Sequence, residues 1–363
     1  MTFNQPDHLQ PNLSPIEPTP PATTPASPTS VFLGRFGLRA GWSALIFIPL
    51  FIVFSILLIV LALGIAGKLP QTIADMTHPA KVTTPHVIPD VRALDAFMAD
   101  ILQFGGLVLA GLIVSRIERR RLSVYGIGRA RLFDFLPGAF WGLATLSLLV
   151  ALLRSTHLLV FDTRALYGTP AFLSGIKWLV AFLAVGLFEE YLSRGFLQYT
   201  LTRGVYGLAE KISLPYARAI AFTIAAFFMS LFFSAGHLHN ARENPIGIVM
   251  TFLAAIVFSY ALWRTGSLWW AIGFHMAWDW AQSFLYGVPD SGQISAGRLF
   301  HTHPTGNPVF SGGIDGPEGS VYVIPVMLLC ILIIRFTTKP GAQPPLAPDL
   351  HPVPEHFQDE RAA

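Results

Sequence analysis

Long apolar runs with few charges are the feature that most constrains this chain. A bilayer core of about 30 Å is crossed by a helix of roughly 20 apolar residues. Eight runs approach or exceed that length, and they lie near 43–66, 98–115, 136–153, 172–200, 217–238, 244–262, 267–285 and 320–335. The sequence therefore predicts an all-α fold, a polytopic transmembrane helical bundle of about eight spans.

The composition excludes the soluble classes that 363 residues would otherwise allow. Charged residues make up 12% of the chain, against roughly 25% in ordinary soluble domains. The net charge of +3 is too small to indicate nucleic-acid binding. A single cysteine, Cys330, lies in an apolar run, which excludes an intramolecular disulfide and any CxxC site.

Both ends of the chain are rich in proline and predict no folded domain. Residues 1–34 lack the basic start and apolar core of a signal peptide. We expect 1–34 and 341–363 to be disordered tails, and 35–340 to form the integral membrane domain.

Basic residues gather in alternate loops between the predicted spans. Arg35 and Arg39 precede the first span, and the run from Arg116 to Arg121 follows the second. Loops rich in lysine and arginine stay in the cytoplasm. We therefore expect a multi-pass protein with both termini cytoplasmic.

Two adjacent glutamates follow an apolar run in the stretch GLFEEYLSRGF. A carboxylate at the centre of a bilayer helix costs about 2.5–3.5 kcal/mol. Glu190 and Arg194 stand four apart, so a structural ion pair accounts for both. It does not account for Glu189, which has no cation three or four positions away and is a functional candidate.

The fifth run ends in FFSAGHLHN, which contains His237. Taken alone, this residue fits a histidine at the membrane interface. Its register adds information, because Glu189 and His237 lie equally far from the loop near 212–213. An antiparallel hairpin would place them at the same depth.

The seventh run contains GFHMAWDW, with His275 and Asp279 four apart and so on one face of a helix. A His–Asp pair that only locks the bundle is one interpretation. The other interpretation is a catalytic role, since three helices would then bring carboxylates and imidazoles together.

Carboxylate and imidazole groups are those that activate water. A glutamate can serve as general base and then acid, while other polar groups stabilise an oxyanion. Two histidines and two carboxylates also suit zinc. Glu189, His237, His275 and Asp279 are therefore alternative metal ligands, although no HExxH motif is present.

Three motifs in this order resemble one family. EEYLSR is similar to an EExxxR motif, FSAGH to FxxxH, and HMAWD to HxxxN/D. They resemble the CPBP intramembrane endopeptidases, which include type II CAAX prenyl proteases and lysostaphin resistance protein A-like proteins. SGGIDGPEGS also resembles a glycine-rich segment of bacterial members, so the family core would span about 171–330.

The resemblance implies hydrolysis of a peptide bond within or near a membrane, without a cofactor. Glu189 would activate water with help from His237, and Glu190 would pair with Arg194. His275 and the residue at 279 would form the oxyanion hole. That last position is asparagine in well-understood relatives and is Asp279 here, which can donate a hydrogen bond only when it is protonated.

The expected partners are a protein or peptide substrate, with or without an attached lipid, and the lipid bilayer of a bacterial inner membrane. Nucleic acid is not an expected partner. A non-catalytic scaffold or immunity protein, a zinc-dependent protease and a proton-coupled transporter stay open as alternatives.

Overall fold

The fold is a bundle of helices with two very small sheets. A computed structural model of the chain describes residues 31–77, 90–240 and 244–348. The α-helices are α1 (Ala40–Ile65), α2 (Leu69–Thr77), α3 (Ala93–Ile117), α4 (Phe135–Ser155), α5 (Gly168–Glu190), α6 (Gln198–Ile212), α7 (Ala217–Gly236), α8 (Pro245–Thr265), α9 (Trp269–Trp280), α10 (Pro308–Ser311) and α11 (Val323–Thr337). The short 3-10 helices are Leu122–Tyr125, Arg129–Asp134, His237–His239 and Pro317–Gly319.

Within the described ranges, six helices are long and apolar enough to cross a membrane. They are Ala40–Ile65, Ala93–Ile117, Leu122–Ser155, Gly168–Ile212, Ala217–Gly236 and Pro245–Thr265. The predicted seventh and eighth runs correspond to shorter helices, α9 with its continuation to Leu285, and α11. The prediction of a polytopic helical membrane bundle is confirmed.

The longest helix runs without a break through 45 residues, from Gly168 to Ile212. Its middle section, Tyr191–Leu197, is π-helical and joins α5 to α6. A second π-helical section, Ala281–Leu285, continues α9. The predicted run 172–200 covers the middle part of the first of these helices, and the sequence predicted neither π-helical section.

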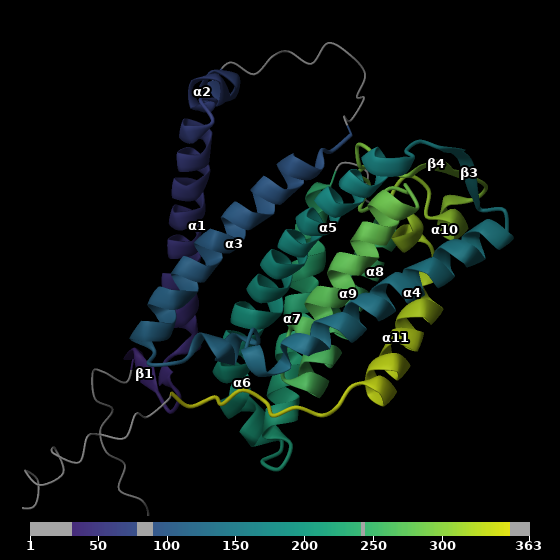
Figure 1. The fold of residues 1–363 in the computed structure, drawn as a ribbon. Helices are drawn as coiled ribbons and strands as arrows, with labels where there is room; N and C mark the ends of the chain where they lie inside the picture. The colour runs from purple at the N-terminus through teal and green to yellow at the C-terminus, as the bar shows by residue number, and fades with distance from the viewer. Residues whose placement is uncertain (1–30, 78–89, 241–243, 349–363) are drawn as a thin grey trace, which may run out of the picture.

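Successive long helices run in alternate directions between two ends of the molecule (Figure 1). α3 packs against α1 and α5, and α5 packs against α9. α4 covers the other side of α9, while α7 packs on α6 and α8. α9 therefore lies inside the bundle, between α4 and α5.

Glycines let α4 and α9 approach closely. A Cβ added at Gly138 or Gly142 would lie 2.1 or 2.3 Å from a backbone carbonyl oxygen of α9. A Cβ at Gly273 would lie 2.2 Å from the carbonyl oxygen of Phe135. Small residues four apart are a common way for membrane helices to pack. This contact fixes the position of α9, which carries His275 and Asp279.

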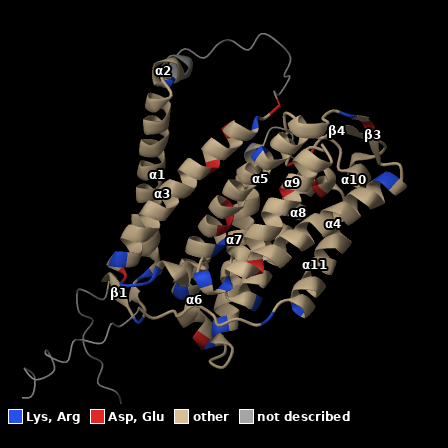
Figure 2. Ribbon diagram, viewed as in Figure 1, with Lys and Arg blue, Asp and Glu red and all other residues tan. Residues whose placement is uncertain are grey.

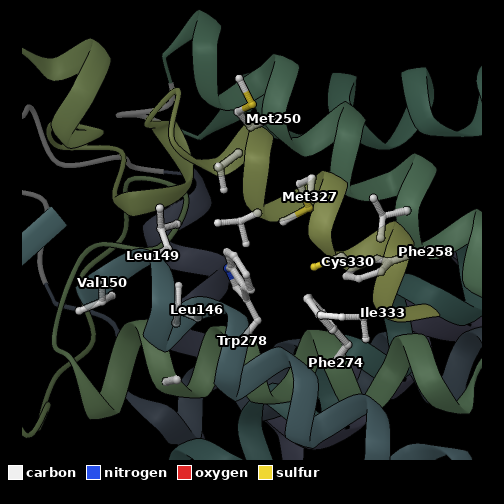
Figure 3. Close-up of a cluster of buried hydrophobic side chains, with 14 of the residues drawn as sticks. Leu146, Leu149, Val150, Met250, Phe258, Phe274, Trp278, Met327, Cys330 and Ile333 are labelled. Carbon is white, nitrogen blue, oxygen red and sulfur yellow. The ribbon is translucent and has the colours of Figure 1, made fainter. Parts of the chain in front are cut away.

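A large apolar cluster joins α4, α8, α9 and α11 (Figure 3). Trp278 of α9 lies near its centre in the view. The labelled members are Leu146, Leu149, Val150, Met250, Phe258, Phe274, Trp278, Met327, Cys330 and Ile333. Cys330 is buried within this cluster.

Two antiparallel strand pairs were not expected from the sequence. β1 (Leu33–Gly34) pairs with β2 (Gly37–Leu38) before α1. β3 (Leu159–Arg164) pairs with β4 (Phe300–Pro304), which brings the loop after α4 to the segment after α9. Both sheets lie outside the long helices, so the helical class is unchanged.

The structure describes a few residues within each of the two predicted tails. Residues 33 and 34 belong to β1, and residues 341–348 run along the bundle without regular helix or strand (Figure 1). In the second segment the backbone carbonyls accept hydrogen bonds, from Tyr199 Oη to Pro345 at 2.6 Å and from Arg120 Nη1 to Ala347 at 3.0 Å. Proline prevents a helix there, and these donors hold the chain instead. The rest of both predicted tails lies outside the described residues.

Lysine and arginine gather at one end of the bundle, around β1 and α6 (Figure 2). We call this the basic end. The run from Arg116 to Arg121 follows α3 there, and Lys211 closes α6. Arg335 stands in the last turn of α11, which also ends there. The first turns of α3 and α8 lie at the opposite end.

Candidate active site

Glu189 and Glu190 stand where α5 passes into the π-helical section. Ser193 Oγ donates a hydrogen bond to the carbonyl oxygen of Glu189. π-helical turns are rare and are found often at functional sites. The two carboxylates point differently, since Glu190 is fully buried and the Glu189 side chain is 26% exposed.

Glu190 and Arg194 form the ion pair expected from their spacing. Arg194 Nη1 donates to Glu190 Oε1 at 2.7 Å, and both side chains are buried. The guanidinium carbon of Arg194 lies 4.2 Å from the ring centre of Phe233 and 5.4 Å from that of Phe258. Stacking on aromatic faces and a paired carboxylate are what stabilise a buried arginine.

His275 connects the two glutamates to Asp279. Its Nδ1–H donates to Glu190 Oε1 at 3.0 Å, because the arginine-paired carboxylate can only accept. Its Nε2 then lies 3.4 Å from Asp279 Oδ2 and 3.7 Å from Glu189 Oε2. One imidazole is therefore held between three carboxylates from α5 and α9.

His237 reaches the same region from the end of α7. Its Nδ1 bonds the carbonyl oxygen of Phe233 at 2.9 Å, so that nitrogen carries the proton and Nε2 remains as an acceptor. Its ring centre lies 4.9 Å from the Phe233 ring. Phe233 thus contacts both His237 and Arg194. Within the described residues, no hydrogen bond joins His237 to the other three candidates.

All four candidate catalytic residues line one cavity of about 740 Å³. Glu189 comes from α5, His237 follows α7, and His275 and Asp279 come from α9. Apolar side chains form much of the remaining wall, and they include Trp178, Phe182, Phe232, Met250, Phe258, Phe274, Trp278 and Met327. Several of these belong to the cluster in Figure 3.

A comparison with protein families adds an independent observation. Residues 170–281 match the family model described as Type II CAAX prenyl endopeptidase Rce1-like. The matched segment belongs to this family. The resemblance inferred from three motifs is therefore confirmed, and all three motifs lie within the Rce1-like segment. No curated protein and no solved structure matches the chain.

The cavity extends beyond the Rce1-like segment. Asp95 and Asp100 of α3 line it on one side, and Asp290 and Glu318 line it on another. Since α3 begins at the end opposite the basic residues, the cavity reaches toward that end (Figure 1). We call this the cavity end.

Sequence reasoning missed Asp100, although a signal was present. Asp100 lies inside the predicted span 98–115 and has no lysine or arginine within four positions. The same rule that selected Glu189 would have selected it. Asp290 lies in a loop and Glu318 in the short 3-10 helix Pro317–Gly319, and neither lies in one of the three motifs, so the sequence gave no indication that they share the cavity wall.

The glycine-rich stretch after the Rce1-like segment closes part of the cavity. Glu318 Oε1 accepts hydrogen bonds from the backbone N–H and the hydroxyl of Ser291. A Cβ at Gly316 would lie 2.2 Å from the carbonyl oxygen of Pro289, and Gly316 has a φ of +119°. Glycine is therefore required where these two loops meet.

The structure also bears on the alternative metal ligands. In the parts of the chain that the structure describes, no group of three or more His, Cys, Asp or Glu side chains is arranged so that it could hold a metal ion. His237 contacts its own helix, and His275 already bonds Glu190.

Proposed function

We propose that the chain is an intramembrane endopeptidase that hydrolyses peptide bonds of membrane-associated or lipidated proteins or peptides. One observation carries the proposal. A half-buried carboxylate, Glu189, and two histidines from different helices line one cavity inside an apolar bundle. The family match over 170–281 supports the same reaction class.

In this mechanism a water molecule binds between Glu189 and His237. Glu189 takes one proton as the water oxygen attacks the carbonyl carbon of the scissile bond, which forms a tetrahedral oxyanion. The C–N bond then breaks, and Glu189 returns the proton to the leaving amine. The neutral Nε2 of His237 accepts a hydrogen bond from the same water.

The other residues position the imidazole ring of His275 and stabilise the oxyanion. Asp279 can donate a hydrogen bond only when it is protonated. We therefore assign the oxyanion contact to an Nε2–H of His275, with Asp279 holding the ring from the next turn of α9. Glu190 fixes the opposite edge of that ring through Nδ1, and Arg194 neutralises Glu190.

The surroundings support a substrate that is partly apolar. Aromatic and methionine side chains line the cavity, and they suit a hydrophobic peptide segment or an attached lipid chain. The positive-inside rule supports a bacterial inner-membrane protein with both termini in the cytoplasm and the cavity end on the opposite face.

The proposed reaction needs no cofactor, because Glu189 itself removes the proton from water. Zinc held by some of the same side chains is the alternative. Chelation separates these two mechanisms, since a glutamate-dependent enzyme keeps its activity when divalent ions are removed.

The test is peptide cleavage by the purified full-length protein in nanodiscs. A diverse pool of quenched fluorescent peptides, lipidated members included, is offered to wild type and to Glu189→Gln. Removing a general base lowers rates by about 100- to 10,000-fold. Glu210→Gln, far from the cavity in α6, is the matched control and should keep full activity.

Each outcome has a distinct meaning. Cleavage that is lost in Glu189→Gln and kept with a chelator supports the proposal. Loss with the chelator as well would support the zinc-dependent protease. No cleavage by folded wild type, across lipidated and plain peptides, would support the non-catalytic scaffold.

A further inference from the structure

Asp100 differs from the other carboxylates of the cavity. Asp95 pairs with Arg92 at 2.6 Å, and Asp279 lies 3.4 Å from His275. Ser283 donates to Asp290 at 2.8 Å, and Ser291 donates to Glu318. Among the described residues, none forms a hydrogen bond or an ion pair with the side chain of Asp100.

The position of Asp100 makes a carboxylate without such a partner energetically unfavourable. It stands in the second turn of α3, a membrane-spanning helix, and its side chain is half-buried. It lines the same cavity as Glu189 and His275. A carboxylate in such surroundings is stabilised by a cation.

The imidazole of His275 is the cationic group in the described lining, and it is already held between Glu190, Glu189 and Asp279. Six carboxylates line the cavity, from Asp95, Asp100, Glu189, Asp279, Asp290 and Glu318. No described lysine or arginine lines it, and Arg194 is buried behind the aromatic rings of Phe233 and Phe258. Charge complementarity therefore favours a ligand that brings its own positive charge.

We propose that Asp100 is a specificity-determining residue that binds a cationic group of the substrate peptide beside Glu189. The group is an alkylammonium or guanidinium, from a lysine or arginine side chain or from the peptide's amino terminus. Apolar neighbours on the same wall, Ala96 and Ala99 of α3 with Val185 of α5, would contact the carbon chain that carries it. This assignment rests on the proposed endopeptidase function for the identity of the ligand.

A binding experiment tests Asp100 without depending on cleavage. Full-length Glu189→Gln protein in nanodiscs is titrated with acylated, fluorescein-labelled 12-residue peptides, and anisotropy reports the Kd. One peptide carries two lysines, and its twin carries two glutamines. N-acetylated and free-amine versions of each separate a side-chain cation from the amino terminus.

We expect the lysine or free-amine peptide to bind about tenfold or more tightly than its neutral twin, because a desolvated charge pair contributes at least that much. Adding Asp100→Asn should reduce the ratio to near one. Asp100→Glu should restore it. Asp95→Asn is the matched control, since Asp95 is also in the lining but is already paired with Arg92.

The results separate this inference from the proposed function. Equal binding of charged and neutral peptides, or a ratio unchanged by Asp100→Asn in protein with an unaltered melting temperature, would overturn the role of Asp100. Selective binding that depends on Asp100, with no cleavage by wild type, would keep the cation site and reject the endopeptidase.

Discussion

At the residue scale, the Glu190–Arg194 pair is the feature with the largest consequence for stability. Both side chains are buried, and Glu190 Oε1 accepts from both Arg194 and His275. Removing one partner of a buried pair leaves a charge without compensation, which costs about 3–5 kcal/mol.

We expect Arg194→Met to lower the free energy of unfolding by about that amount. Thermal unfolding in detergent measures it. Arg35→Met is the matched control, because the Arg35–Glu210 pair is exposed and such pairs contribute about 0–1 kcal/mol. Adding Glu190→Gln to Arg194→Met should recover much of the loss. A melting temperature equal to that of Arg35→Met would contradict the prediction.

Sequence predicted this pair from spacing alone, because helical residues four apart share a face. It also singled out Glu189, His237, His275 and Asp279, which line one cavity in the structure. It did not predict that His275 bonds Glu190, since the rotation of α9 against α5 depends on packing across the bundle. Asp100 was missed for a different reason, because no motif includes it.

At the element scale, the packing of α4 on α9 controls where His275 lies. Gly142 of α4 leaves room for the backbone of Phe274, the residue before His275. A side chain at 142 would push α9 away from α4 and toward the cavity.

We expect Gly142→Val to cost about 1–3 kcal/mol or more, as overpacking does, and to reduce peptide cleavage because His275 moves. Thermal unfolding and the cleavage assay measure the two effects. Gly207→Ala in α6 is the control, since nothing lies within 4 Å of its added Cβ. That variant should be neutral or slightly stabilising. If both variants behave alike, close α4–α9 packing is not what positions the site.

The eight apolar runs predicted the helices to within a few residues at most ends, because hydropathy and length decide which segments cross a bilayer. The π-helical sections and the β3–β4 pair were not predicted. A π-helical turn has no simple composition signal. The β3–β4 pair joins segments that lie well over 100 residues apart, and hydropathy carries no information on such contacts.

At the scale of the whole molecule, the basic end and the cavity end lie at opposite ends of the bundle. Ala130 lies in an exposed 3-10 helix near the basic end, and Thr163 lies exposed in β3. Cys330 is the native cysteine and is buried, so it should react slowly with external reagents.

We therefore expect Thr163→Cys to react with a membrane-impermeant maleimide on intact bacterial cells. Ala130→Cys should react only after the cells are permeabilised. The wild-type protein, with Cys330 alone, is the background control. Labelling of Ala130→Cys in intact cells would reverse the orientation and place the cavity end in the cytoplasm.

Sequence predicted this asymmetry through its basic loops, since those charges act on topology before the helices pack. It could not predict which end the cavity reaches, because the lining comes from α3, α5, α7, α8, α9, α11 and the segments between α9 and α11 together.

The π-helical section Tyr191–Leu197 makes the site sensitive to chain length. Each residue of an ordinary α-helix turns the chain by about 100°. Deleting one residue there would remove the wide π-helical turn and let regular α geometry continue into α6. The residues between Glu190 and α6 would then move by one position relative to the two glutamates, and Arg194 would stand three residues after Glu190 instead of four. Related chains that keep this chemistry should therefore differ in side chains along this section while keeping its number of residues.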